Sequence, residues 1–173
     1  AFVAAESERG GVLVANGEGE ARLRDTGDAI EYRPFSGDPL RIGGSWSGPS
    51  RGWLERTWDG AYPDAAFHIL DQFRTRRSGD LLVVAREGYD FRGRFELPEH
   101  RAGHGSLIRA HMQTPVWSSR PVPAGPVRTV DLFPEMLAWL GVDAPAVMDG
   151  QRFRSPAEPV PEKKRPHPVR VTA

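Results

Sequence analysis

The stretch Ser78-Gly-Asp-Leu-Leu-Val-Val-Ala85 indicates the fold class more strongly than any other part of the sequence. It places four consecutive apolar residues, 81–84, directly after a Ser-Gly-Asp turn. An uninterrupted apolar run of this length is typical of a strand buried on both faces, as in a sheet covered by helices. The sequence therefore predicts a buried strand over residues 81–85.

A helix is predicted immediately before this strand. Tyr62-Pro63-Asp64 fits a helix start, because proline is tolerated in the first turn and a carboxylate is favoured at the positive end of the helix dipole. Helix, tight turn and buried strand make up the second half of a βαβ unit, so the sequence predicts an α/β fold with a mostly parallel sheet. Apolar residues recur at helical spacing up to about residue 77, namely Ala66, Phe67, Leu70 and Phe73.

The N-terminal region predicts a small antiparallel meander. Short strand-like runs at 12–15, 20–24 and 29–32 are separated by turn signals, of which Asn16-Gly17 is the clearest. Residues 34–50 are rich in Gly, Ser and Pro and predict a loop. We expect three large side chains to anchor this loop by burying apolar area, those of Trp46, Trp53 and Trp58.

The C-terminal region predicts one more helix, Leu132–Leu140, which Gly141 is placed to end. From Ser155 the chain is Pro-rich and charged, so we expect one domain over 1–154 and a disordered tail over 155–173. The chain opens at Ala1 without signal-peptide features, and we expect a domain truncated at its N-terminus. The apolar stripe expected to be buried on the helix comprises Val130, Phe133, Met136, Leu137 and Leu140.

Composition narrows the classes of function. The chain has 173 residues, a net charge of zero and no cysteine. Zero net charge gives no whole-chain support for nucleic-acid or anionic-membrane binding, and no apolar run approaches the ~18 residues of a membrane span. We expect a soluble protein, and the lack of cysteine suits the bacterial cytoplasm or an exported location equally. A metal site would have to use His, Asp or Glu.

Three of the five histidines follow the predicted strand within a short region: His100, His104 and His111. His104 lies between Gly103 and Gly105, which let the backbone turn and bring an imidazole close to an ion. Ligand sites of α/β sheets gather beyond the carboxyl ends of strands. His104 is therefore the candidate metal ligand, although zinc requires about four ligands.

Other polar residues are candidates for contact with substrate or for supporting a ligand. His100 could act as a substrate contact or second ligand, whereas His111 is expected to hydrogen-bond a backbone group or carboxylate beside the metal. Asp90, just past the strand, could contact substrate or order its loop. Arg128 could pair with a phosphoryl oxygen or form a structural salt bridge.

A series of short motifs runs in order along residues 37–150. They are Gly37-Asp38-Pro39-Leu40, Tyr62-Pro63-Asp64, Arg77-Ser78-Gly79-Asp80, Gly88-Tyr89-Asp90, His100 with Gly103-His104-Gly105-Ser106, His111-Met112 with Pro115, Arg128-Thr129-Val130-Asp131-Leu132-Phe133-Pro134, Leu140-Gly141 and Asp149-Gly150. In their order and spacing they resemble the C-terminal part of alkaline-phosphatase-superfamily enzymes. The type I phosphodiesterase/nucleotide pyrophosphatase branch is the most similar.

The resemblance implies an alkaline-phosphatase-like α/β sandwich that hydrolyses phosphate or sulfate esters with two metal ions, usually zinc, and a Ser or Thr nucleophile. It also implies His104 as a metal ligand. The Asp-His-Gly turn and the nucleophile segment of that family do not occur in this sequence. We therefore expect the C-terminal fragment of a metal-dependent phosphodiesterase-type hydrolase, inactive alone. Its expected partners are a small phosphate ester and the missing N-terminal half of the same fold.

Two alternative interpretations stay open. The chain could be a non-catalytic structural or binding module derived from that fold. It could also be a sulfatase-like or phosphotransferase member of the same superfamily.

Overall fold

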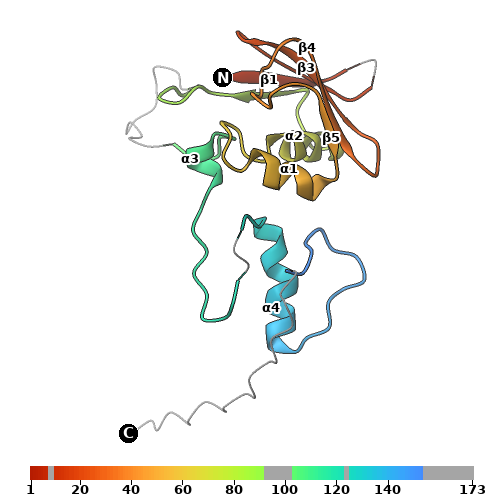
Figure 1. Ribbon diagram of the computed structural model, residues 1–173, viewed down its shortest axis with the longest axis vertical. Helices are drawn as coiled ribbons and strands as arrows, with labels where there is room; N and C mark the ends of the chain where they lie inside the picture. The colour runs from red at the N-terminus through yellow and green to blue at the C-terminus, as the bar shows by residue number, and fades with distance from the viewer. Residues whose placement is uncertain (8–9, 92–102, 123–124, 154–173) are drawn as a thin grey trace, which may run out of the picture. The chain divides into compact units, whose positions relative to one another are not determined.

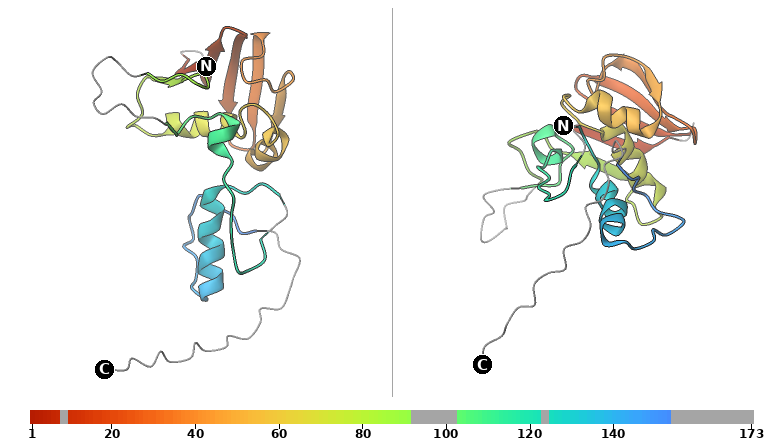
Figure 2. Two further views of the ribbon diagram at one scale, coloured as in Figure 1. Left: turned by 90° about the vertical axis from the view of Figure 1, so that its left-hand side faces the viewer. Right: turned by 60° about the horizontal axis from the view of Figure 1, so that its bottom comes forward.

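The computed structural model describes residues 1–7, 10–91, 103–122 and 125–153 (Figures 1 and 2). The chain divides into two compact units, 1–117 and 118–173, which are described separately below. None of the helices in the described ranges is both long and apolar enough to cross a membrane.

The first unit is built on a six-stranded sheet in which every neighbouring pair of strands is antiparallel. The strand order is β5-β4-β3-β2-β1-β6, so β5 and β6 form the two edges. The meander predicted over residues 12–32 corresponds to β2–β4, which lie inside this larger sheet. The strands are β1 (Phe2–Glu6), β2 (Val12–Asn16), β3 (Gly19–Asp25), β4 (Ile30–Gly37), β5 (Trp46–Gly48) and β6 (Leu81–Val84).

The predicted α/β sandwich with a mostly parallel sheet is wrong. The apolar run that suggested it is strand β6, which pairs antiparallel with β1 in the register Phe2↔Val84. The run is also not buried on both faces, because Leu81 is 61% and Val83 45% exposed. An apolar run predicts that a strand has apolar surroundings, but it specifies neither the partner strand nor its direction.

Helices α1 (Ser50–Thr57) and α2 (Ala65–Arg74) cover one face of the sheet (Figure 2). Helix α2 is the helix predicted over 62–77, shortened at both ends. The predicted loop 34–50 instead contains the end of β4 and the whole of β5. A short helix, α3 (Arg109–Met112), follows the segment that carries His104.

The core between the sheet and the two helices is centred on Trp53. Its side chain is fully buried, and its Nε1 donates a hydrogen bond of 3.0 Å to the Ile30 carbonyl of β4. The rings of Trp46 and Tyr32 meet the Trp53 ring edge-on, with centroids 4.5 and 6.3 Å away. Trp53 therefore ties α1 to the sheet, which is the anchoring role predicted for it.

The second unit contains a 3-10 turn, η1 (Thr129–Asp131), and helix α4 (Leu132–Leu140), whose bounds match the prediction. Gly141 ends the helix with a φ of 68°, a left-handed conformation that glycine adopts without strain. Within the second unit, the described residues do not bury the apolar stripe that the sequence predicted to be buried. Its exposed members are Val130 (42%), Phe133 (48%), Met136 (47%) and Leu140 (65%).

Two carboxylates explain this reversed burial. Asp131 accepts hydrogen bonds of 3.0 Å from the backbone N–H groups of Arg128 and Gln151, and Glu135 accepts one from the N–H of Phe153. Both carboxylate residues are buried. Buried backbone N–H groups need acceptors, so residues 151–153 pack against the acidic face of the helix and leave the apolar face outside.

Candidate functional site

An open cleft of about 660 Å³ runs along the edge strand β6 in the first unit. One wall comes from residues 82–85 and another from helix α2. The segments 88–91 and 103–107, together with His111, complete it. The cleft gathers imidazole and carboxylate groups from three parts of the chain, and it is the candidate site.

His104, the predicted metal ligand, is exposed on the cleft wall. Gly105 follows it with a φ of 88°, so the chain turns directly after the imidazole through a conformation that glycine adopts readily. Asp90 lies next to the same turn, because a Cβ placed on Gly103 would be 3.8 Å from Asp90 Oδ2. The structure thus brings together His104 and Asp90, which are 14 residues apart in the sequence.

His111 organises the His104 loop through its ring. Its Nδ1 accepts a hydrogen bond of 3.3 Å from the backbone N–H of Ser106. A neutral imidazole that accepts at Nδ1 carries its proton on Nε2, so this arrangement leaves no ring lone pair for a metal. His111 therefore hydrogen-bonds a backbone group of the loop that carries His104.

Two polar residues of the cleft were missed by the sequence analysis, His68 and Asp71 on helix α2. His68 Nε2 lies 3.6 Å from Oδ2 of Asp64, a buried carboxylate one helical turn earlier. The available signal was their i, i+3 spacing, which places both side chains on one face of a helix. That signal was overlooked because the apolar residues of the helix dominate its pattern.

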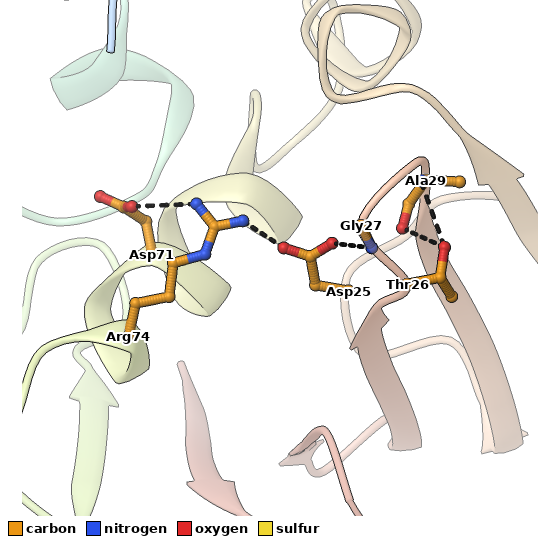
Figure 3. A network of polar contacts seen from close by, with 6 residues as sticks. All are labelled: Asp25, Thr26, Gly27, Ala29, Asp71 and Arg74. Carbon is orange, nitrogen blue, oxygen red and sulfur yellow. Dashed lines mark hydrogen bonds and ion pairs between the residues drawn. The ribbon is translucent and has the colours of Figure 1, made fainter. Parts of the chain in front are cut away.

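An ion-pair network links helix α2 to the β3–β4 turn (Figure 3). Arg74 pairs with Asp25 of β3 and lies 3.4 Å from Asp71, one turn earlier on the helix. Hydrogen bonds from the Gly27 N–H and from Arg74 hold the pKa of Asp25 below its usual range. The helix that carries the cleft residues His68 and Asp71 is thus connected to the sheet by its exposed Arg74 as well as by its buried core residues.

Two predicted site residues remain, His100 and Arg128. His100 lies outside the described residues. Arg128 belongs to the second unit, where its backbone N–H donates to Asp131 at the start of η1.

The described side chains around His104 do not form a complete metal site. Among the described residues, no group of three or more His, Cys, Asp or Glu side chains is arranged to hold a metal ion. A zinc ion takes about four ligands, of which imidazole nitrogen and carboxylate oxygen are two common types. His104, with Asp90 nearby, therefore fits one side of such a site and not a complete one.

A second cleft, of about 1020 Å³, is larger but chemically less suited to be the site. It is lined by Arg41 and Arg109, among others, and both guanidinium groups are already paired. Arg41 binds Glu18, and Arg109 Nη2 lies 3.0 Å from Asp59 Oδ1. Because these charges are satisfied within the protein, size alone does not favour this cleft over the one that contains the histidines.

Comparisons with known proteins found no matching family model, no matching curated protein and no matching solved structure.

Proposed function

We propose that this chain contributes part of the active site of a metal-dependent hydrolase of phosphoric esters. His104 supplies one metal ligand, and the remaining ligands and the nucleophile come from polypeptide outside the described residues. The chain alone is expected to bind zinc weakly and to turn over no substrate.

The observation that supports this proposal most directly is the position of His104 in the cleft. The imidazole is exposed, borne on a glycine-flanked turn, and accompanied by Asp90 from a separate segment. An exposed imidazole in a cleft near a carboxylate is a chemically reasonable half of a zinc site. The motif order along residues 37–150, which resembles the alkaline-phosphatase superfamily, supports phosphoric esters as the substrate class.

Each group of the chain has a separate part in this scheme. His104 would hold the ion through a ring nitrogen, and His111 supports the His104 loop through its hydrogen bond with Ser106. A bound metal ion would polarise the ester and stabilise the leaving oxygen. Asp90 would help to orient the His104 loop, because its Oδ2 lies beside Gly103, while its Oδ1 accepts a hydrogen bond of 2.7 Å from the Phe91 N–H.

A second candidate function is that of a non-catalytic binding or structural module. The incomplete donor set favours it, because the described residues hold no group able to bind a metal ion by themselves. A module of this kind would keep the cleft without any dependence on zinc.

Zinc affinity separates the two candidates. Zn²⁺ binding to the 173-residue chain is measured by competition with a chelating dye, for the wild type and for His104→Ala. The proposal predicts measurable binding that weakens tenfold or more in His104→Ala, because a ligand is removed. His68→Ala is the matched control, since it removes an imidazole from the α2 wall of the same cleft.

The outcome that contradicts the proposal is equal zinc affinity in the wild type and His104→Ala, or no zinc binding by the wild type. For an assembled active enzyme, nitrophenyl phosphate mono- and diesters and nitrophenyl sulfate identify the ester class. Cleavage of the sulfate alone would replace the phosphoric-ester assignment with the sulfatase-like one.

A further inference from the structure

The face of the sheet opposite the helices carries an apolar patch that no described residue covers. It lies on β2, β1 and β6, where directly opposed residues share a face in the registers Val3↔Ala15 and Val3↔Val83. Three of its side chains are well exposed: Val3 (39%), Leu81 (61%) and Val83 (45%). We call this set the outer apolar patch; its members are Val3, Ala5, Leu13, Ala15, Leu81 and Val83.

The patch ends at β6, whose second edge pairs with no other strand of the described sheet. No described backbone group outside β1 hydrogen-bonds to β6, and residues 82–85 line the open cleft. Edge strands are normally protected from pairing by charged residues, prolines or bulges. Strand β6 reads Leu-Leu-Val-Val and has none of these within its four residues.

Charges flank this unprotected edge on both sides. Asp80 precedes β6 and Arg86 follows it shortly after, and both side chains are exposed. Neither forms an ion pair with another described residue; Arg86 only lies over the Tyr89 ring, 5.8 Å from its centroid. The edge thus has an acidic group at one end and a basic group at the other.

We propose that a second copy of this chain pairs with the edge of β6, antiparallel and about a two-fold axis at Val83. In this register Leu82 lies opposite Val84, Leu81 opposite Ala85, and Asp80 opposite Arg86 of the second copy. A two-fold interface is self-complementary, so it contains the Asp80–Arg86 pair twice.

The alternation of faces selects this register. Pairing centred between Leu82 and Val83 would place core-facing residues opposite outward-facing ones. This does not occur in a pleated sheet, because directly opposed side chains lie on the same face. Pairing centred on Leu82 would place Asp80 beside the core-facing Val84. Pairing centred on Val84 would place Leu82 opposite Arg86. The register centred on Val83 alone matches the faces and also opposes the two charges.

The same pairing joins the outer apolar patches of the two copies into one continuous surface across the axis. Because Val83 meets its own counterpart there, apolar side chains of both copies come into contact beside the paired strands. This adds burial of apolar area to the backbone hydrogen bonds. The inference is argued from the sheet and its edge charges. Because β6 also lines the cleft that contains His104, the paired second copy would lie beside that cleft.

Sedimentation velocity of the 173-residue chain over a range of concentrations tests the proposal. The wild type is expected to form a concentration-dependent dimer. Asp80→Arg and Arg86→Asp each place like charges opposite one another twice, and each is expected to weaken the dimer about tenfold. The double variant Asp80→Arg/Arg86→Asp restores opposite charges and is expected to recover the wild-type affinity.

Two further variants complete the experiment. Val83→Lys sets two ammonium groups against each other at the axis and is expected to abolish the dimer; circular dichroism checks that it remains folded. Asp28→Arg, in the β3–β4 turn, is the matched control and should leave the dimer unchanged. A monomeric wild type overturns the proposal. The proposal is also overturned if neither single charge reversal weakens the dimer, or if the double variant does not recover the wild-type dimer affinity.

Discussion

Helices α2 and α4 differ in how they use their apolar residues. Helix α2 buries Ala66 and Ile69 against the sheet. Helix α4 has a single charged residue, Glu135, and it is this residue that is buried while Phe133 and Leu140 are exposed. The helix with the more apolar sequence is therefore the one that leaves its apolar face outside.

The difference shows that apolar periodicity decides burial only where a matching surface is present. Helix α2 has such a surface in the sheet. In the second unit, the described segment 151–153 instead brings backbone N–H groups to α4, and these require acceptors that Asp131 and Glu135 provide. Hydrogen-bond demand has oriented α4, whereas apolar burial has oriented α2.

The largest expected effect tests the apolar side of this comparison. Ile69→Ala in α2 should lower the free energy of unfolding of the first unit by about 2–5 kcal/mol, because a fully buried side chain is replaced by a cavity. Leu140→Ala in α4 is the matched control and should cost less than about 0.5 kcal/mol, since Leu140 is 65% exposed. Hydrogen exchange resolved by peptide measures each helix separately. Equal losses of unfolding free energy in Ile69→Ala and Leu140→Ala would contradict the proposed difference between α2 and α4.

The polar side of the comparison is tested by Glu135→Ala. It removes the acceptor of the buried Phe153 N–H, which should destabilise the second unit by about 1–3 kcal/mol. The amide of Phe153 should then exchange faster. Glu55→Ala, an exposed acidic position in α1, is the control and should have little effect. If Phe153 keeps its protection in Glu135→Ala, hydrogen-bond demand does not orient α4.

Asp38 extends the comparison to a carboxylate of the first unit. Burial of Asp38 opposes its ionisation, but hydrogen bonds from the Tyr32 hydroxyl (2.6 Å) and the Gly43 N–H (2.7 Å) outweigh burial and hold its pKa below the usual range. A lowered folded-state pKa stabilises the fold above the unfolded-state pKa of about 4, and that stability is lost as pH falls through the folded value.

We therefore expect the stability of the wild type to fall with pH below about 4 more steeply than that of Asp38→Asn. Urea unfolding at a series of pH values measures the difference between the two proteins. Asp25, whose pKa is also lowered, is present in both proteins, so its contribution cancels in the difference between their free energies of unfolding. Parallel pH profiles would show that Asp38 does not stabilise the folded state through its charge.

The smallest expected effect concerns the network of Figure 3. Arg74→Ala should cost less than about 1 kcal/mol, because the Arg74 side chain is 53% exposed and solvent screens its pairs with Asp25 and Asp71. The loss should shrink further in high salt. A loss of several kcal/mol in thermal unfolding would show that the network, and not the core, holds α2 in place.

The sequence predicted local structure better than it predicted the arrangement of strands. The α4 bounds and the β2–β4 meander could be read locally, because Gly141 and Asn16-Gly17 are strong local signals. The partner of β6 could not, because β1 lies some 75 residues earlier and Leu-Leu-Val-Val fits a strand in either direction. Local patterns carry no information on which distant strand a segment meets.

For the candidate site, the glycine-flanked His104 could be identified from its neighbours alone. The approach of Asp90 and of the α2 residues His68 and Asp71 could not, because it depends on how the edge of β6 lies beside α2. Asp131 and Glu135, the carboxylates that orient α4, could also be identified in the sequence. Their partners, the N–H groups of residues 151–153, carry no sequence signal at all.

Site-resolved spectra of the imidazole nitrogens during a Zn²⁺ titration test the central claim most directly. We expect the resonance of a ring nitrogen of His104 to shift on zinc addition as that of a metal-bound nitrogen does, while His111 keeps its hydrogen bond with Ser106. Unchanged His104 resonances, with zinc bound at other histidines or not at all, would contradict it.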